Sequence, residues 1–352
     1  MKDTDFFKNQ KPEKTIIPGL ILNAPVVPKT TVGEIGLELE IEGRNLVGGF
    51  DLGSLKGPDT NTVWTTHQDG SLRGEALEYV FNTPCSERDL ASLVNGLYDS
   101  FNTNKTKLTL SNRCSTHVHI NMQGAKINEL TSVLALWMTF EEALIAWNGE
   151  ERINNHFCLS GSQTRNVSTA WREYLSGDGA PNQEGLKYSS LNVLTLWRFG
   201  SFEFRVGRGA ESPEYVITWA KFLNRFCNYA RKVFVNPQLI GSGLSEQTGS
   251  ELFKNIVENI DMVEFGEEVI KNFGGEAEFN ESCLKGFRNA QPFVGLFPWN
   301  DWLYEINKEY IPNPFTETKV KHYNRAIFGG VDPGNGPIVF EEELDRLRIR
   351  NT

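Results

Sequence analysis

The stretch Gly36-Leu37-Glu38-Leu39-Glu40-Ile41-Glu42-Gly43 alternates strictly between apolar and acidic residues. Strict alternation predicts a β-strand, because successive side chains of a strand point to opposite faces of its sheet. The apolar side chains are expected on one face and the three glutamates on the other. Neighbouring glutamates would then lie only about 6–7 Å apart, where like charges repel. Such a row fits either an exposed edge strand, which charges protect from aggregation, or a face that binds metal ions.

Three further predicted strands also place ionisable groups on one face. These groups are Glu78 in 75–83, His117 and His119 in 116–122, and Glu203 and Arg205 in 201–206. Each strand alone has an ordinary explanation, such as an exposed side chain or a surface ion pair of little energetic value. Only five histidines occur in the chain, however, and two of them lie in one alternating strand. Carboxylates with one or two imidazoles are typical ligands of magnesium or manganese, so the joint pattern favours a metal-binding face.

The remaining patterns divide the chain into three regions: a Pro-punctuated arm over 1–32, a central domain over 33–235 that carries these strands, and a mostly helical extension over 236–352. Further short strands are expected at 20–27, 63–67 and 191–195, an extended piece at 107–110, and helices after Ser86 and at 127–147, 169–175, 213–235, 250–262, 264–273, 301–309 and 341–350. The Gly-rich segment 45–59 and the long irregular segment 148–186 are expected to form loops, and a loop as long as 148–186 is either functional or disordered.

Composition restricts the class of protein. The chain has 352 residues, 39% of them apolar and 23% charged, which is ordinary for a globular protein. The net charge of −10 argues against tight, non-specific binding to nucleic acid, which requires clustered Lys and Arg. The five cysteines are widely spaced without a Cys-x-x-Cys pair, which favours a reduced interior without a zinc knuckle. No signal peptide or membrane span is evident, so a cytoplasmic location is predicted.

Six motifs follow one another along the chain: Glu-x-Glu at 38–40, Asp-Gly-Ser at 69–71, Glu78 before an apolar run and Pro84, His-x-His after Cys114, Lys-Tyr-x-x-Leu-Asn at 187–192, and Glu-x-Arg at 203–205. Their order resembles that of the amidoligase family, a group of carboxylate–amine ligases frequent in phages and bacteria; if a phage encodes the chain, the predicted cytoplasm is that of its host. The resemblance covers about residues 31–231. The family usually has Gly after the cysteine, where this chain has Ser115. The amidoligase family is related to glutamine synthetase and gamma-glutamylcysteine synthetase, and the resemblance therefore implies an α+β fold. Its curved antiparallel sheet would hold divalent metals and ATP on the inner face and helices on the outer face.

The resemblance also implies roles for individual residues. The implied metal ligands, for Mg²⁺ or Mn²⁺, are Glu38, Glu40, Glu78, His117 and Glu203. The implied nucleotide-binding residues are His119, Arg152, Lys187, Tyr188 and Asn192. The implied catalytic residues are Asp69, which would take a proton from the incoming amine, Glu203, and Arg205, which would stabilise the transferred phosphoryl group. Glu42, Ser71 and Trp171 have no assigned role at this stage.

The expected activity is therefore ATP-dependent amide-bond formation through an acyl-phosphate intermediate. The partners would be a carboxylate and an amine, each a small molecule or a peptide, and the sequence leaves their identity and the oligomeric state open. Two alternatives remain. The chain could be a non-catalytic ligand-binding or virion-associated protein on the same fold. It could also be a metal-dependent hydrolase or nuclease, because carboxylates and histidines also serve two-metal phosphodiester cleavage.

Overall fold

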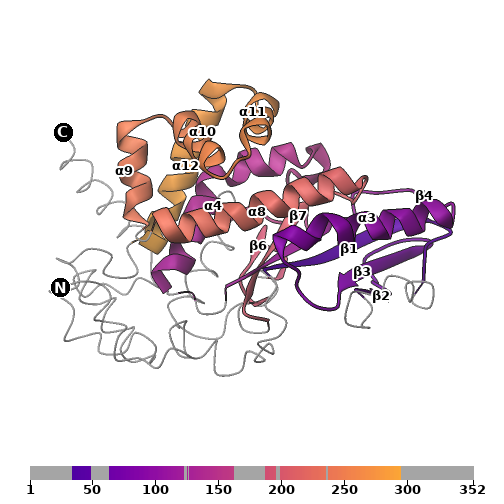
Figure 1. The fold of residues 1–352 in the computed structure, drawn as a ribbon. Helices are drawn as coiled ribbons and strands as arrows, with labels where there is room; N and C mark the ends of the chain where they lie inside the picture. Colours follow the sequence, from indigo (N-terminus) through magenta and orange to yellow (C-terminus); the bar gives the residue numbers. More distant parts are fainter. Residues whose placement is uncertain are drawn as a thin grey trace.

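The structure, a computed structural model, describes residues 34–48, 63–122, 125, 127–161, 187–195, 199–234 and 237–294. The expected elements at 20–27, 169–175, 301–309 and 341–350 lie outside these residues, as do Trp171 and most of the Gly-rich segment. Within them the α+β prediction is confirmed: helices cover an open antiparallel sheet of seven strands (Figure 1).

Six of the strands follow one another in the order β2-β3-β1-β5-β7-β6, and β4 pairs with the end of β1. The strands are β1 (Ile35–Arg44), β2 (Trp64–His67), β3 (Ala76–Phe81), β4 (Lys107–Leu108), β5 (Thr116–Asn121), β6 (Leu191–Asn192) and β7 (Ser201–Gly207). The strand predicted from the alternating stretch is thus confirmed, and it lies inside the sheet rather than at its edge. A central position removes the edge-strand explanation of its glutamates.

The two faces of β1 have opposite characters, as the alternation predicts. Leu37, Leu39 and Ile41 are buried in the hydrophobic core, with at most 1% of their surface exposed. Glu38 and Glu40 point to the other face, where they line a cavity. The helices cover the apolar face because burying it removes a large apolar area from water.

The helices form the second part of the molecule. They are α3 (Glu87–Thr103), α4 (Ile127–Trp147), the short 3₁₀ helix η4 (Glu150–Arg152), α8 (Pro213–Val233), α9 (Gln238–Glu246), α10 (Gly249–Asn259), α11 (Val263–Asn272) and α12 (Glu276–Val294). Figure 1 shows α3 and α8 lying over the sheet and α9–α12 gathered beyond α4 and α8. The sequence patterns do not single out α9 and α12, yet α12 packs along α4 over its length.

Local sequence explains where several helices begin. Ser86 caps α3 by accepting a hydrogen bond from the Asp89 amide, and Ser212 caps α8 in the same way, followed by Pro213 in the first turn.

Helix α4 is buried on nearly all sides, and most of its side chains belong to the hydrophobic core. Over Glu129–Trp147 it is long and apolar enough to cross a membrane, but 89% of that window is buried inside the protein, as in a core helix.

Candidate active site

The ionisable side chains of four strands face one another because of the strand register. Glu40 lies opposite Glu78 across β1 and β3. Glu38 lies opposite His117 across β1 and β5, and His119 lies opposite Glu203 across β5 and β7. Directly opposed residues of an antiparallel pair share a face and have close Cβ atoms. The alternation within each strand and the register between strands thus place these glutamates and histidines on one face of the sheet.

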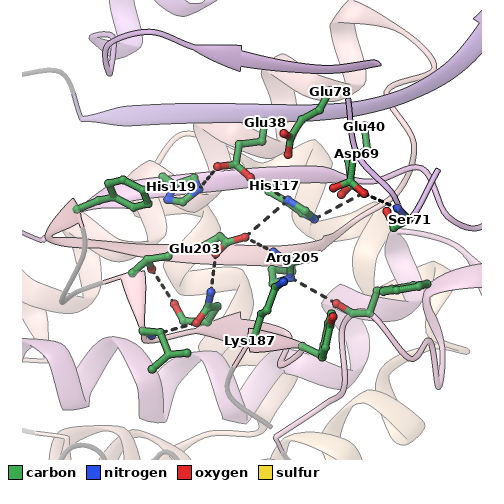
Figure 2. Close-up of a pocket in the computed structure, with 16 residues that line it drawn as sticks. Glu38, Glu40, Asp69, Ser71, Glu78, His117, His119, Lys187, Glu203 and Arg205 are labelled. Carbon is green, nitrogen blue, oxygen red and sulfur yellow. Dashed lines mark hydrogen bonds and ion pairs between the residues drawn. The ribbon is translucent and has the colours of Figure 1, made fainter. Parts of the chain in front are cut away.

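This face forms one wall of a cavity of about 600 Å³ (Figure 2). The lining residues are Glu38, Glu40, Asp69, Ser71, Glu78, His117, His119, Phe157, Lys187, Tyr188, Asn192, Leu194, Thr195, Phe199, Glu203 and Arg205. Of the twelve site residues expected from the sequence, all except Arg152 are in this set. The structure thus brings together residues that are up to 167 positions apart in the chain, from Glu38 to Arg205.

The first group of potential ligands surrounds His117. Its Nδ1 atom lies 3.2 Å from Glu38 Oε2 and 3.6 Å from Glu203 Oε1. Ligand atoms of these three residues lie within 4.8 Å of one another. His119 Nε2 lies 3.1 Å from the other oxygen of Glu38. Burial alone would raise the pKa of the Glu38 carboxyl, but its hydrogen bonds to His117 and His119 outweigh burial and hold the pKa well below its usual range.

The second group consists of Glu40, Asp69 and Glu78, whose carboxylate oxygens also lie within 4.8 Å of one another. Burial, and then the negative charges of Glu38, Glu40 and Asp69, raise the pKa of Glu78 to about 7. Burial acts on Asp69 in the same direction, but hydrogen bonds from Ser71, including its amide at 2.5 Å, lower the Asp69 pKa overall.

Both groups fit a divalent metal ion by their donor chemistry. Carboxylate oxygens with one imidazole nitrogen are the ligands that Mg²⁺ and Mn²⁺ accept, and neither group contains the thiolates of a structural zinc site. A divalent cation would also relieve the repulsion between the carboxylates, which the raised pKa of Glu78 reflects.

Arg205 brings a positive charge to the centre of this wall. Its Nη1 atom donates a hydrogen bond to Glu203 Oε1, and Asn192 Nδ2 donates to the other oxygen of Glu203 at 2.6 Å. Burial alone would raise the pKa of Glu203, but the charge of Arg205, together with smaller effects of His119 and His117, outweighs burial and lowers the pKa. Glu203 is therefore ionised and held on two sides, so its orientation is fixed before any ligand arrives.

The strand that carries Arg205 has an irregular register at this point. Thr116 pairs with Gly207, whereas Val118 pairs with Phe204, so two steps along β5 match three steps along β7. This is the geometry of a β-bulge, which commonly redirects side chains next to active sites.

Arg152 holds this bulge in place. Its guanidinium donates to the carbonyl oxygens of Arg205 at 2.7 Å and of Val206 at 3.2 Å. The side chain is buried and is absent from the residues that line the cavity in the described part of the chain. The expectation that Arg152 contacts phosphate is therefore corrected: it binds the backbone that presents Arg205.

Two further contacts hold the turn that carries Asp69 and Ser71. Glu42 accepts a hydrogen bond from the Arg73 amide at 2.8 Å, and Arg113 donates to the Ser71 carbonyl at 2.7 Å. The third glutamate of β1 thus has a structural role next to the cavity.

Aromatic and apolar side chains complete the cavity. Lys187 Nζ lies 5.3 Å from the ring centroid of Tyr188, and Phe199, 45% exposed, lies edge-on to His119. Phe157, Leu194, Thr195 and Phe199 also line the cavity and were not expected as site residues, because in the structure they lie outside the regular strands, and β6 ends at Asn192 although a strand was expected over 191–195.

Ser115 is a further residue that the sequence reasoning missed. It is buried and its hydroxyl contacts both Glu40 and His117. A usable signal existed, because position 115 directly precedes the predicted strand and continues the alternation of 117 and 119. The structure thus adds Ser115 to the site residues.

The sequence matches no protein-family model and no curated protein sequence. The functional argument therefore rests on the arrangement of side chains. That arrangement can bind divalent cations, hold anionic groups beside Arg205, and offer carboxylates as proton acceptors.

Proposed function

We propose that this chain is an ATP-dependent carboxylate–amine ligase with the sheet architecture of glutamine synthetase relatives, acting in the cytoplasm. One observation carries the proposal: two groups of metal-binding side chains and a fixed arginine line the same cavity on one face of an antiparallel sheet. The order of the motifs along the chain supports it, because it resembles that of the amidoligase family.

The chemistry explains why such a cavity is needed. A carboxylate does not condense with an amine in water unless one of its oxygens becomes a leaving group. Attack of a carboxylate oxygen on the γ-phosphorus of ATP forms an acyl phosphate and releases ADP. The amine nitrogen then attacks the acyl carbon, the amine gives up a proton, and inorganic phosphate leaves with its bonding electron pair.

Each part of the cavity has a task in this scheme. The Glu38, His117, Glu203 group, and Glu40 and Glu78 of the second group, would hold magnesium or manganese, which supplies charge neutralisation for the phosphates. Arg205 is aimed at the transferred phosphoryl group, and His119, Lys187, Tyr188 and Asn192 are assigned to contacts with the nucleotide.

The acidic end of the cavity is assigned to the amine. Asp69 lines this end of the cavity and would attract a protonated amine, which must lose its proton before it can attack. Asp69 is assigned to take that proton, because Glu40 and Glu78 are assigned to the metal ion and the raised pKa of Glu78 belongs to the ion-free cavity.

The test is a screen of ATP-dependent ADP release against panels of carboxylates, amino acids and polyamines, with mass spectrometry of the products. The expected product has the mass of acid plus amine minus water. Glu40→Gln and Glu203→Gln should each abolish substrate-dependent ADP release. Glu142→Gln, a matched change at the Lys285 ion pair outside the cavity, should retain it.

The same experiments separate the alternatives. Full activity in both Glu40→Gln and Glu203→Gln would overturn the assignment. Phosphate release without a condensed product, or cleavage of DNA or RNA with manganese, would identify a hydrolase. Calorimetry with a non-hydrolysable ATP analogue and magnesium tests the binding step, and absence of binding would favour the non-catalytic alternative.

A further inference from the structure

The two groups of potential metal ligands are joined by one buried side chain, Ser115. Only 2% of its surface is exposed. Its hydroxyl donates a hydrogen bond to Glu40 Oε2, in the second group, and lies 2.7 Å from His117 Nε2, in the first group. Its backbone carbonyl accepts a hydrogen bond from the Glu40 amide at 2.9 Å, so Ser115 is fixed against β1 by main chain and side chain alike.

The number of protons determines the direction of these hydrogen bonds. A serine hydroxyl has one proton, and an ionised carboxylate can only accept. The Ser115 proton therefore points to Glu40, and the Ser115 oxygen must accept from His117. The proton of a neutral His117 ring consequently lies on Nε2, and the lone pair lies on Nδ1.

Nδ1 can donate a hydrogen bond to Glu38 at 3.2 Å only when it carries a proton; in this neutral tautomer, which a metal ligand requires, its lone pair instead faces that oxygen and a Glu203 oxygen 3.6 Å away. A lone pair facing two anions is unfavourable unless a cation lies between them. The same three residues were identified above as a potential ligand group.

We propose that Ser115 is a positioning residue that fixes the Nε2–H tautomer of His117, makes Nδ1 the metal-binding atom, and couples this ligand group to the second group through Glu40. The proposal rests on the metal binding included in the proposed function. A hydrogen bond to the ring nitrogen that does not bind the metal fixes the orientation of a ligating histidine, and its loss commonly lowers metal affinity by about 10–100-fold.

The first test reads the tautomer in the unmodified protein. Selective ¹⁵N labelling of the five histidines gives five pairs of imidazole signals, and the pair lost in His117→Asn assigns His117. In the Mg²⁺-loaded full chain we expect a proton on Nε2 and none on Nδ1. A proton on Nδ1 of the Mg²⁺-loaded protein would overturn the proposal. This measurement needs no variant of Ser115, so it decides the matter even if such a variant does not fold.

The second test measures binding of Mn²⁺ alone by electron paramagnetic resonance. Ser115→Ala should weaken the binding of one ion by about 10–100-fold, and Ser115→Thr, which keeps the hydroxyl, should restore most of that affinity. Ser132→Ala is the matched control, because the Ser132 hydroxyl is buried and has no hydrogen-bond partner within the described residues. Wild-type Mn²⁺ affinity in Ser115→Ala would overturn the proposal.

These tests contain no ATP, acid or amine. If the ligase screen fails while the tautomer and Mn²⁺ tests give the expected results, the proposed activity is rejected and the role of Ser115 is kept. If the screen succeeds while Nδ1 of His117 is protonated, the activity is kept and the role of Ser115 is rejected.

Discussion

Glu38 and Glu78 lie on neighbouring strands of one sheet, yet their surroundings push their pKa values in opposite directions. Two imidazoles lower the pKa of Glu38, whereas burial and neighbouring carboxylates raise that of Glu78 to about 7. Opposite shifts in one cavity are typical of functional sites, because a purely structural site gains nothing from an unpaired buried carboxylate. The opposite pKa shifts of Glu38 and Glu78 therefore support the proposal that this cavity binds cations.

The raised pKa of Glu78 predicts an unusual dependence of stability on pH. The folded pKa of about 7 exceeds the ordinary value of 4.5, so the folded protein binds more protons than the unfolded chain between these values. The contribution of Glu78 to stability is present at low pH and is lost as pH rises through this window. In EDTA, Glu78→Gln should therefore raise the melting temperature much more at about pH 8 than at about pH 5. Equal shifts at both pH values would contradict the assignment.

Arg152 predicts an effect on both stability and activity. Removing its guanidinium in Arg152→Met leaves the Arg205 and Val206 carbonyls without these donors, which should cost about 1–3 kcal/mol of unfolding free energy in urea titrations. Because the bulge presents Arg205, ADP release should fall as well. Arg88→Met, at an exposed ion pair, is the control and should change neither quantity. Unchanged stability in Arg152→Met would refute the role given to Arg152.

At the scale of elements, register and close approach position the site. Gly36 lies opposite His119, and a Cβ atom there would lie 3.2 Å from the His119 Cβ, so the glycine leaves room for the imidazole. On the helical side, a Cβ atom at Gly286 would lie 2.2 Å from the Met138 carbonyl oxygen. This glycine lets α12 approach the backbone of α4, which in turn supports the strands through the shared core.

A pair of glycine substitutions tests this helix contact. Gly286→Ala should force α12 away from α4 and lower the unfolding free energy by about 1–3 kcal/mol, as overpacking usually does. Gly243→Ala, in the middle of α9, would place its Cβ no closer than 3.4 Å to a neighbour and should stabilise by up to about 1 kcal/mol through helix propensity. Both free energies of unfolding come from the same denaturation experiment. A Gly286→Ala protein with the unfolding free energy of the wild type would show that α12 does not need this close approach.

At the scale of the whole molecule, one hydrophobic core extends from the sheet through α4 and α8 to α12. The polar face of the same sheet carries the cavity, so the proposed cation site and the hydrophobic core lie on opposite faces of the same strands. Anything that binds only the folded state stabilises it by mass action.

Divalent cations should therefore raise the melting temperature. Mg²⁺ or Mn²⁺ at about 100 times its dissociation constant should add about 2.7 kcal/mol of unfolding free energy, and EDTA should reverse the effect. Sodium chloride at the same ionic strength is the control and should not reproduce it. Glu38→Gln should lose most of the shift, because Glu38 is a potential ligand of the first group. An equal shift in Glu38→Gln would remove Glu38 from the ligand set.

The sequence by itself determined the faces of the strands and the residue types on them. Alternation is a local property, so Glu38 and Glu40 could be separated from Leu37 and Leu39 without any knowledge of their neighbours. Local signals also predicted the start of α3 at its Ser86 cap, and the extent of α4 from Ile127 to Trp147.

Only the tertiary structure decided which strands are neighbours and which residues meet. The pairing of Glu38 with His117, the bulge held by Arg152, and the bridge made by Ser115 depend on contacts between segments far apart in the chain. The approach of α12 to α4 at Gly286 is of the same kind. Periodicity within one segment specifies which way a side chain points, but the partner it meets is fixed by how the whole chain packs.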